Sequence, residues 1–361
     1  MNLPSEIINL VLYFTENKIY EICLVSKYFN INVKKMRILD NRKFYIVNDG
    51  RLALVPNLTS LDCDTKIGMT MDKKRVVVKN KITNEGIRNL YSLTHLKLDK
   101  NLIINIEGIR DLPNLISLSL SRNTIIKDED LRLLTNLQYL NLFCNNIITT
   151  QSVSSLTNLK RIEFSDRHPV DDEGISCLTN LTSLNLIYNN SITDRGISVL
   201  TNLTSLNLSY NNRITDNCIS LLVNLTSLDL RFNEQITDQG LANLTNLVTL
   251  NLEHNNLITD SGLSTNLRKL DLGSNSVITD NGLSSLTKLE ILSLYCNGNI
   301  TVRGLNHLFS LEKLCFNGLN NPDDYIIINK ETRKLIKCLF TVKQNNTLSP
   351  KDIDRLFCFV K

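Results

Sequence analysis

The sequence has little of what an active site or a metal centre needs. Its four histidines, His95, His168, His254 and His307, are scattered along the chain. No Cys or His residues have the spacing of a zinc site. No glycine-rich phosphate loop is present, because the glycines recur at a regular interval. We therefore expect no catalytic residues, no metal and no cofactor, and a chain that is not an enzyme.

The chain also lacks a long apolar run and a strong charge bias. No apolar stretch reaches the roughly 18 residues of a membrane-spanning helix. The net charge of +4 over 361 residues is too small to indicate a nucleic-acid surface. The opening MNLPSEIINLVLYF has no basic leader, and the nine dispersed cysteines include no CxxC pair. We expect a cytoplasmic or nuclear protein that is not secreted, with neither membrane nor nucleic acid as a partner.

What the sequence does contain is one unit written many times. Each copy opens on a leucine, which is position 1 of the repeat, and each copy takes the number of that leucine as its name. The copies begin at Leu93, Leu115, Leu137, Leu159, Leu181, Leu203, Leu225, Leu247, Leu267, Leu289 and Leu311. Every step is 22 residues, except the 20 residues between copies 247 and 267. Fixed self-similarity at this interval indicates a solenoid.

The first half of the repeat predicts a short strand followed by a bend. Positions 1, 4 and 6 are apolar, as in Leu203, Leu206 and Leu208, and the alternation at positions 4 and 6 predicts one buried strand face. Position 9 is Asn in nine of ten full copies, and copy 159 has Arg167 there. An amide side chain has both donors and an acceptor. We therefore expect stacked asparagines to bond the backbone of neighbouring turns.

The second half of the repeat predicts a short helix. Positions 12 to 14 commonly contain Ile-Thr-Asp, in which Thr or Asp can cap a helix. Positions 17 and 20 are apolar and lie on one helical face, as in Ile197 and Leu200. Glycine is common at position 16, where we expect it to permit close approach of adjacent turns. The 20-residue copy 247 should lose part of its helix.

The pattern LxxLxLxxN followed by ITDxGL resembles leucine-rich repeats, in particular the type found in F-box/leucine-rich-repeat (LRR) proteins. The resemblance covers about residues 71–318, with 71–92 as a worn copy and 54–64 as a candidate start of another. It implies an α/β leucine-rich-repeat solenoid, curved, with a parallel β-sheet on the concave face and short helices on the convex face. We expect a linker and degenerate first repeats over 46–92, regular repeats over 93–318 and a C-terminal helical cap over 319–361.

The first 45 residues predict a separate small helical domain. The segments LPSEIINLVLYF and IYEICLVSKYFNINV each have a helical apolar pattern. Together they resemble an F-box, although the turn between them is one residue shorter than the commonest spacing and Phe29 stands where Trp is frequent. The matching residues are Leu3, Pro4, Glu6, Ile7, Leu24, Val25, Ser26, Lys27 and Phe29.

In F-box proteins this domain binds a Skp-type adaptor, and through it a cullin, while the repeats hold a protein substrate for ubiquitination. The resemblance implies that this chain is the substrate-recognition subunit of such a ligase, with an unidentified protein substrate. The implied adaptor contacts are Leu3, Pro4, Ile7, Leu24, Val25 and Phe29. The alternative is a non-catalytic LRR scaffold or inhibitor whose N-terminal helices act only as a cap.

Recognition is expected where the repeat does not dictate the residue. Positions 3, 5, 7 and 8 should face the concave side, and position 5 is so uniformly small and polar that a solvated face explains it. Positions 7 and 8 vary, and they supply the predicted substrate-binding residues Phe143, Tyr188, Tyr210, Arg231, Phe232, Glu253, His254 and Tyr295. Aromatic and Arg side chains are enriched at interface centres, but position 8 can also pack structurally against the bend, and both interpretations stay open. Acidic and basic residues on this face balance, so the sequence predicts no charge for the partner.

Overall fold

The computed structural model describes residues 38–39, 49–53, 56–63, 66–69, 75–78, 82–165, 168–315 and 325–327. The chain divides into two compact units. Unit 1 comprises Met1–Phe164 with His168–Val170, and unit 2 comprises Ser165–Arg167 with Asp171–Lys361. Of the predicted F-box domain over residues 1–45, the structure describes only Ile38–Leu39, which form a strand, and the six adaptor-binding residues lie outside the described residues.

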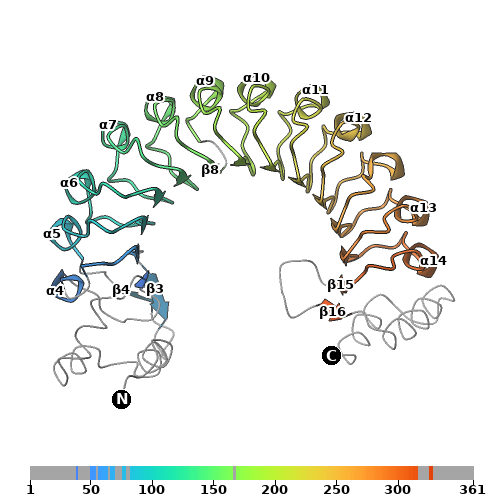
Figure 1. Ribbon diagram of the computed structural model, residues 1–361, viewed down its shortest axis with the longest axis horizontal. Helices are drawn as coiled ribbons and strands as arrows, with labels where there is room; N and C mark the ends of the chain where they lie inside the picture. The colour runs from blue at the N-terminus through green and yellow to red at the C-terminus, as the bar shows by residue number, and fades with distance from the viewer. Residues whose placement is uncertain are drawn as a thin grey trace, which may run out of the picture. The chain divides into compact units, whose positions relative to one another are not determined.

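Unit 1 is a stack of turns, each with one strand and one short helix. Its strands pair in parallel in the order β1 (Ile38–Leu39), β2 (Ser60–Asp62), β5 (His95–Lys97), β6 (Ser117–Ser119), β7 (Tyr139–Asn141) and β8 (Arg161–Glu163). Its helices are α4 (Asp49–Leu52), α5 (Asn84–Ile87), α6 (Ile106–Ile109), α7 (Asp128–Leu131) and α8 (Thr150–Val153). The strands line the concave side of the unit and the helices its convex side (Figure 1).

Unit 2 repeats the same arrangement. Its parallel strands are β9 (Ser183–Asn185), β10 (Ser205–Asn207), β11 (Ser227–Asp229), β12 (Thr249–Asn251), β13 (Lys269–Asp271), β14 (Ile291–Ser293) and β15 (Lys313–Cys315). Its α-helices are α9 (Asp172–Ser176), α10 (Asp194–Ile197), α11 (Asp216–Ile219), α12 (Asp238–Leu241), α13 (Asp280–Leu283) and α14 (Val302–Leu305). Equivalent residues of successive copies are paired, such as Leu206 with Leu228, so the predicted solenoid is confirmed in both units.

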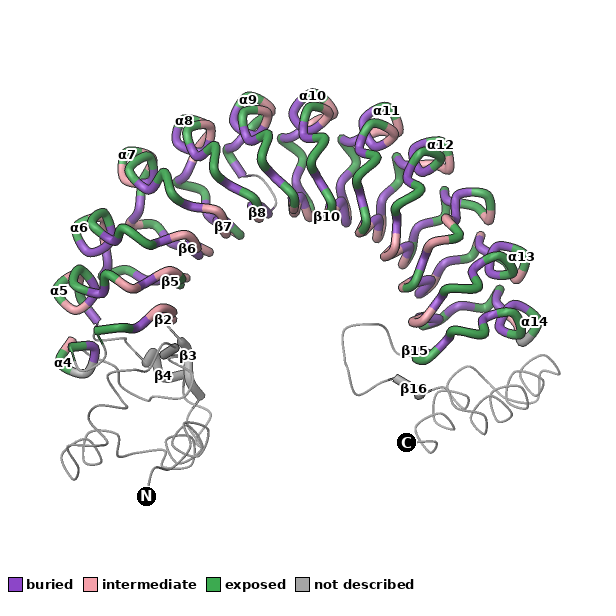
Figure 2. The backbone as a smooth tube through the Cα atoms, in the orientation of Figure 1, coloured by how far each residue is buried: buried purple, intermediate pink, exposed green. Residues whose placement is uncertain are grey.

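The core of each unit is the stack of apolar positions between strands and helices. In copy 203, Leu203, Leu206, Leu208, Ile214 and Ile219 are all at most 1% exposed. Buried stretches recur in every turn of the described tube, on its strand side and on its helix side (Figure 2). A single turn has no layer on either side to cover these groups, so each turn depends on its neighbours for burial.

The position 9 asparagines form the predicted ladder between turns. The Asn145 Nδ2 donates to the carbonyl oxygens of Leu120 and Asn123, both at 3.0 Å, in the preceding turn. Its Oδ1 accepts from the backbone N–H groups of Ile147 and Ile148, at 3.0 and 3.1 Å. Both donors and the acceptor are used, which allows the buried amide to hold the bend without an unsatisfied polar group.

A second ladder joins the short helices, and the sequence did not predict it. Thr193 caps its own helix, as expected, by accepting from Arg195 N–H. The following aspartate, Asp194, reaches the next turn instead and accepts from the N–H and the Oγ1 of Thr215, at 2.8 and 2.5 Å. A Cβ on Gly196 would lie only 2.5 Å from Asp172 Oδ1 of the preceding turn, which confirms close approach at position 16.

Residues 71–92 do not form a separate worn copy, so that prediction is wrong. β3 (Lys66–Met69) and β4 (Arg75–Val78) pair with each other as an antiparallel hairpin. β2 pairs directly with β5, which makes the hairpin an insertion in a copy that begins at Leu58 and ends with α5. The candidate start of a copy at 54–64 contains strand β2, which pairs in parallel with β5 like the strands of the other copies.

Two local departures end or shorten the pattern in unit 2. Copy 247 has only the single 3₁₀ turn η2 (Asp260–Gly262), as its shorter length predicted. β16 (Tyr325–Ile327) pairs antiparallel with β15 and stops the parallel series. The helices predicted for the C-terminal cap lie outside the described residues.

Candidate protein-recognition surface

Position 8 has a left-handed backbone conformation, with a positive φ, in nine of the described copies. These residues are Lys100, Arg122, Cys144, Tyr188, Tyr210, Phe232, His254, Ser274 and Cys296, with φ between 49° and 58°. This left-handed region is sparsely occupied by bulky residues. Here it turns the chain from the strand toward the buried Asn at position 9. The predicted bend at position 8 is therefore present.

Four of these residues bring their rings together in unit 2. Ring centroids of Tyr188 and Tyr210 are 4.3 Å apart, those of Tyr210 and Phe232 are 4.4 Å apart, and those of Phe232 and His254 are 4.2 Å apart. The interplanar angles are only 12° to 21°. We call this stack the aromatic ladder. Its inner ring faces cover one another, so its middle rings present mainly their edges.

The ladder is both structural and accessible. Tyr188 is 44% exposed and His254 is exposed, whereas Tyr210 and Phe232 are half-buried. Burial, followed by a hydrogen bond with Tyr188, raises the pKa of Tyr210, so the two hydroxyls lie close together. Aromatic pairs of this geometry contribute about 0.5–1.5 kcal/mol each. Neither sequence interpretation of position 8 excludes the other, because the rings support one another and still meet solvent.

Position 7 places charged groups beside the ladder. The Arg231 Nε donates to both carboxylate oxygens of Asp229 at 3.1 Å, and the guanidinium lies 3.9 Å from Glu253. Although burial opposes it, the Asp229 carboxylate raises the pKa of Arg231. Two of the predicted residues, Arg231 and Glu253, are therefore neighbours just beyond the ends of adjacent strands β11 and β12. Asp229 completes the group.

The next strand adds a buried carboxylate and a gap in the side chains. Asp271 is 2% exposed, and burial, together with the charge of Glu253, raises its pKa. Gly273 occupies position 7 of this copy. A Cβ built there would lie 3.2 Å from Glu253 Cγ and 3.6 Å from Tyr295 Cβ. Gly273 is thus flanked by Glu253 on one side and by the 38% exposed Tyr295 on the other.

The side chain at position 5 has a structural role that the sequence did not predict. Its side-chain oxygen accepts a hydrogen bond from the backbone N–H of position 7. The pairs are Asn141 with Phe143, Asn185 with Ile187, Asn207 with Ser209, Asp229 with Arg231, Asn251 with Glu253, and Asp271 with Gly273, at 2.8–3.1 Å. A solvated face is thus an incomplete explanation, because only a short side chain with an acceptor oxygen can close this local turn.

Unit 1 carries Phe143 and an aromatic group that the sequence did not indicate. Phe143 lies at position 7 and is 37% exposed. Tyr139, at position 3, donates to Glu163 at 3.2 Å, and the Arg161 guanidinium lies 5.4 Å from its ring centre. Burial, with the Glu163 charge, raises the pKa of Tyr139 to about 12. The available signal was an aromatic residue at a position that is Ser in four of the ten full copies and Tyr in this one alone.

Two kinds of site are not found in the part of the chain that the structure describes. No three His, Cys, Asp or Glu residues there come together in a way that could hold a metal ion. None of the helices described is both long enough and apolar enough to cross a bilayer.

Comparison with protein families identifies the repeat. A model described as leucine-rich repeats in two copies matches residues 223–264. A single-copy leucine-rich-repeat model matches residues 133–157, 177–200, 199–223 and 263–286. The copies are leucine-rich repeats. No curated protein matches the sequence significantly.

Solved structures with leucine-rich-repeat solenoids share the fold. The internalin inlF from Listeria monocytogenes is 26% identical, with a TM-score of 0.53 over 86% of this chain and 87% of the internalin chain. The TLR13–ssRNA13 complex gives 24% identity and a TM-score of 0.50, and covers 81% of this chain but 45% of the TLR13 chain. The structure of the yeast Rad7–Elc1 complex gives 21% identity over 82% of this chain and 89% of the matched chain. Its TM-score is 0.44, and nothing about partners is inferred from it.

Proposed function

We propose that this leucine-rich-repeat chain is a non-catalytic scaffold that binds a protein on the strand side of unit 2. The observation that carries the proposal is the aromatic ladder. Stacked repeats present extended concave surfaces to other proteins. Aromatic side chains with little conformational freedom are favoured at the centres of such interfaces.

The backbone alone does not require rings at these positions. Lys100, Cys144 and Ser274 occupy position 8 with φ values of 55°, 54° and 49°, almost the same as Tyr210 at 55°. The repeat thus accepts charged, small and aromatic side chains equally in this conformation. Four consecutive aromatic residues therefore need a reason beyond the bend itself. Mutual stacking supplies part of it, and a partner that contacts the exposed edges supplies the rest.

We further propose that the bound protein is a substrate for ubiquitination. The support is the resemblance of the first 45 residues to an F-box, which would connect the repeats to a Skp-type adaptor and a cullin. Leu3, Pro4 and Ile7 from the first segment and Leu24, Val25 and Phe29 from the second would contact the adaptor. The competing possibility is that these residues only cap the solenoid.

Photo-crosslinking tests the recognition surface. A photoreactive amino acid at Ile187, next to the ladder at position 7, should capture a protein partner from cells. The same group at the exposed Val199, on the helix side of the same turn, should not capture that partner. Capture at Ile187 should disappear in a Tyr210→Ser, Phe232→Ser variant. Equal capture at both sites, or capture that survives this variant, would contradict the proposal.

Co-purification of adaptor and cullin tests the ligase connection. The variant Leu3→Ala, Pro4→Ala, Ile7→Ser should lose the Skp-type adaptor and keep the protein captured at Ile187. The ladder variant should do the reverse, and thus serves as the matched control. If the adaptor never co-purifies, or survives the N-terminal changes, the chain is a scaffold without this connection.

A further inference from the structure

The ladder lies beside an excess of carboxylates in unit 2. Positions 3 to 10 of copies 225, 247 and 267 hold four carboxylates, Asp229, Glu234, Glu253 and Asp271, but only two side-chain cations, Arg231 and Lys269. The whole chain has the opposite balance, with a net charge of +4. The same positions of copies 93, 115 and 137 in unit 1 also have the opposite balance, with three cations to one carboxylate. The acidity is therefore local to copies 225 to 267, which include the Phe232 and His254 end of the ladder.

The cations present do not neutralise this group. Arg231 is committed to Asp229 through contacts of 3.0–3.1 Å, and its distance to Glu253 is 3.9 Å. The charge of Glu253 raises the pKa of Asp271, in addition to the larger effect of burial, so the two carboxyls repel each other. A further cation close to Glu253 would relieve this repulsion.

Glu253 is also well placed to meet such a cation. It is partly exposed, and Glu253 and Tyr295 flank Gly273 from the two neighbouring copies, since a Cβ on Gly273 would lie 3.2 Å from Glu253 Cγ and 3.6 Å from Tyr295 Cβ. A carboxylate with an aromatic ring beside it suits Lys or Arg, because both groups attract a cation. The His254 end of the ladder adjoins Glu253 in the sequence. The charges of Glu253 and Arg231 also act on Tyr210, so the acidic group lies beside the ladder.

We infer that the partner of unit 2 is a basic protein segment, in which Lys or Arg side chains meet Glu253 and Tyr295 while apolar or aromatic side chains lie on the ladder edges. This deepens the proposed function and rests on it. Carboxylates repel the phosphates of nucleic acids and of anionic lipids, so neither fits this surface. The ladder is already ordered by stacking, which lowers the entropy cost of binding.

Selection from random peptides displayed on phage tests the inference without a known partner. The full chain is the bait, and peptides that also bind the Tyr210→Ser, Phe232→Ser variant are removed. In the remaining peptides, Lys plus Arg should exceed Asp plus Glu by about threefold or more, and aromatic residues should be enriched. Peptides rich in Asp and Glu, peptides without a charge preference, or an empty selection would overturn the inference.

Two variants sharpen the result with a synthetic copy of the best selected peptide. Glu253→Gln should weaken its binding about three- to tenfold, and added salt should reduce the difference from the wild type. Glu129→Gln, on the exposed face of α7 in unit 1, is the matched control and should leave binding unchanged. Equal affinity of the wild type and Glu253→Gln would overturn the inference.

The two proposals can fail separately. If the protein captured at Ile187 depends on the ladder but contacts it through an acidic or neutral segment, the scaffold function stands and the basic-segment inference fails. If nothing is captured at Ile187, the scaffold function itself fails. A thermal melt of each variant, compared with the wild type, verifies that lost binding does not reflect unfolding.

Discussion

The same backbone position carries different chemistry in the two units. Position 8 has nearly constant φ values in both, yet it is Lys100, Arg122 and Cys144 in unit 1 and a run of four stacked rings in unit 2. The repeat thus determines where this side chain stands and leaves its identity free. Function in such a molecule is found by comparing copies at one position, because positions under structural constraint look alike in every copy.

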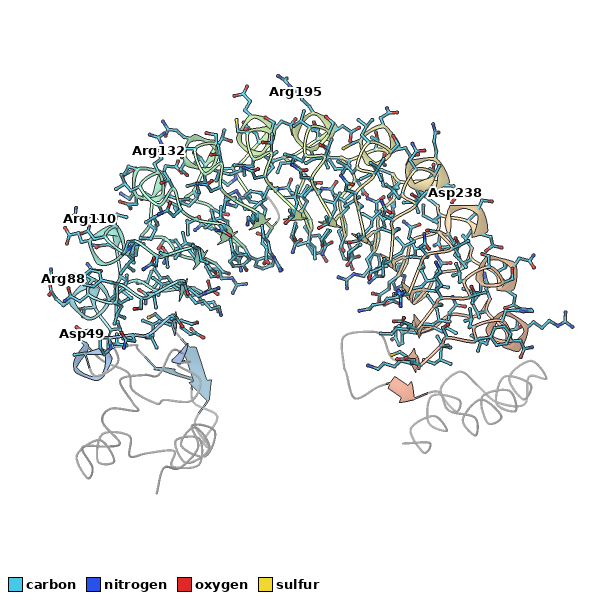
Figure 3. All side chains as sticks on the ribbon, in the orientation of Figure 1. Asp49, Arg88, Arg110, Arg132, Arg195 and Asp238 are labelled. Carbon is cyan, nitrogen blue, oxygen red and sulfur yellow. The ribbon has the colours of Figure 1, made fainter. Side chains whose placement is uncertain are left out.

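The contrast between the constrained and the free positions is visible in the side-chain view. The Arg and Asp residues labelled in Figure 3 lie in or directly after the short helices, and Asp49 and Asp238 accept the same kind of interturn hydrogen bond. Arg88, Arg110, Arg132 and Arg195 are exposed there. Positions 7 and 8, on the concave edge of the strands, differ from copy to copy, and the proposed recognition surface lies there.

The largest expected effect tests whether the apolar cores of the two units are equally stabilising. Leu206→Ala in unit 2 and Leu118→Ala in unit 1 each remove a fully or almost fully buried position 4 side chain. Each should lower the free energy of unfolding by about 2–5 kcal/mol, measured by urea denaturation. Very unequal losses would show that the units differ in their cores as well as in their edges.

Acid should affect unit 1 selectively. Copy 159 lacks the position 9 Asn, and His168 takes over part of its task, because its Nδ1 accepts from the Val170 N–H at 3.2 Å. His168 is 1% exposed and packs 4.8 Å from the Phe164 ring, and burial lowers its pKa to about 4. The neutral ring is therefore the form that the fold holds.

The sign and size of the effect follow from that pKa. The unfolded chain, with an ordinary His pKa near 6.5, takes up the proton first as pH falls. The contribution of neutral His168 to the free energy of unfolding is fully present above pH 6.5 and is lost between pH 6.5 and about 4. The total loss from this one group is about 3 kcal/mol. Amide hydrogen exchange should show the loss around residues 162–170, and His168→Asn should remove the dependence on pH in this window.

The ladder should be worth a smaller amount, and only in unit 2. Tyr210→Ser removes two stacked contacts and should cost about 1–3 kcal/mol of unfolding free energy. Arg122→Ser changes the exposed residue at the same position of unit 1 and should cost less than about 0.5 kcal/mol. Equal costs would show that position 8 is under one structural constraint everywhere, and would weaken the argument for recognition.

The smallest expected effect concerns Gly298, whose Cβ position no other turn contacts closely. A Cβ on Gly298 would meet nothing within 4 Å, whereas one on Gly108 would lie 2.7 Å from Asn84 Oδ1. Gly298→Ala should change the melting temperature very little or raise it slightly, by a free energy of at most about 1 kcal/mol. Gly108→Ala should lower it, as should Gly196→Ala, because position 16 is crowded in both units.

The sequence was sufficient for the strands, the core and the asparagine hydrogen bonds, and insufficient for the other contacts between turns. Periodicity predicted the strands, the core and the Asn145 type of ladder, because each copy states the same requirement again. It did not reveal that Asp194 bonds Thr215, since either residue alone looks like a helix cap. It also missed the hairpin at 66–78, because the segment around Arg75 retains enough apolar residues to imitate a copy.

The recognition residues were identified as a list and not as an arrangement. Position 8 was expected on the concave face, but stacking of Tyr188 on Tyr210 depends on a left-handed backbone that aligns successive rings. The sequence of a single copy does not predict a left-handed conformation at a non-glycine residue. Phe143 and Tyr295 were selected with the ladder, yet the structure gives them other neighbours. The charge beside the ladder also emerged only when Arg231 was found committed to Asp229.

The interturn hydrogen bonds make each copy an exchangeable module. If residues 203–224 were deleted, Asp194 would stand before Thr237 as it now stands before Thr215, and Asn233 would follow Asn189. No donor on that seam would lose its partner, and Tyr188 would be left facing Phe232. Unequal recombination between such similar coding segments can therefore lengthen or shorten the aromatic ladder by one ring at a time, while the remainder of the molecule keeps its bonding pattern.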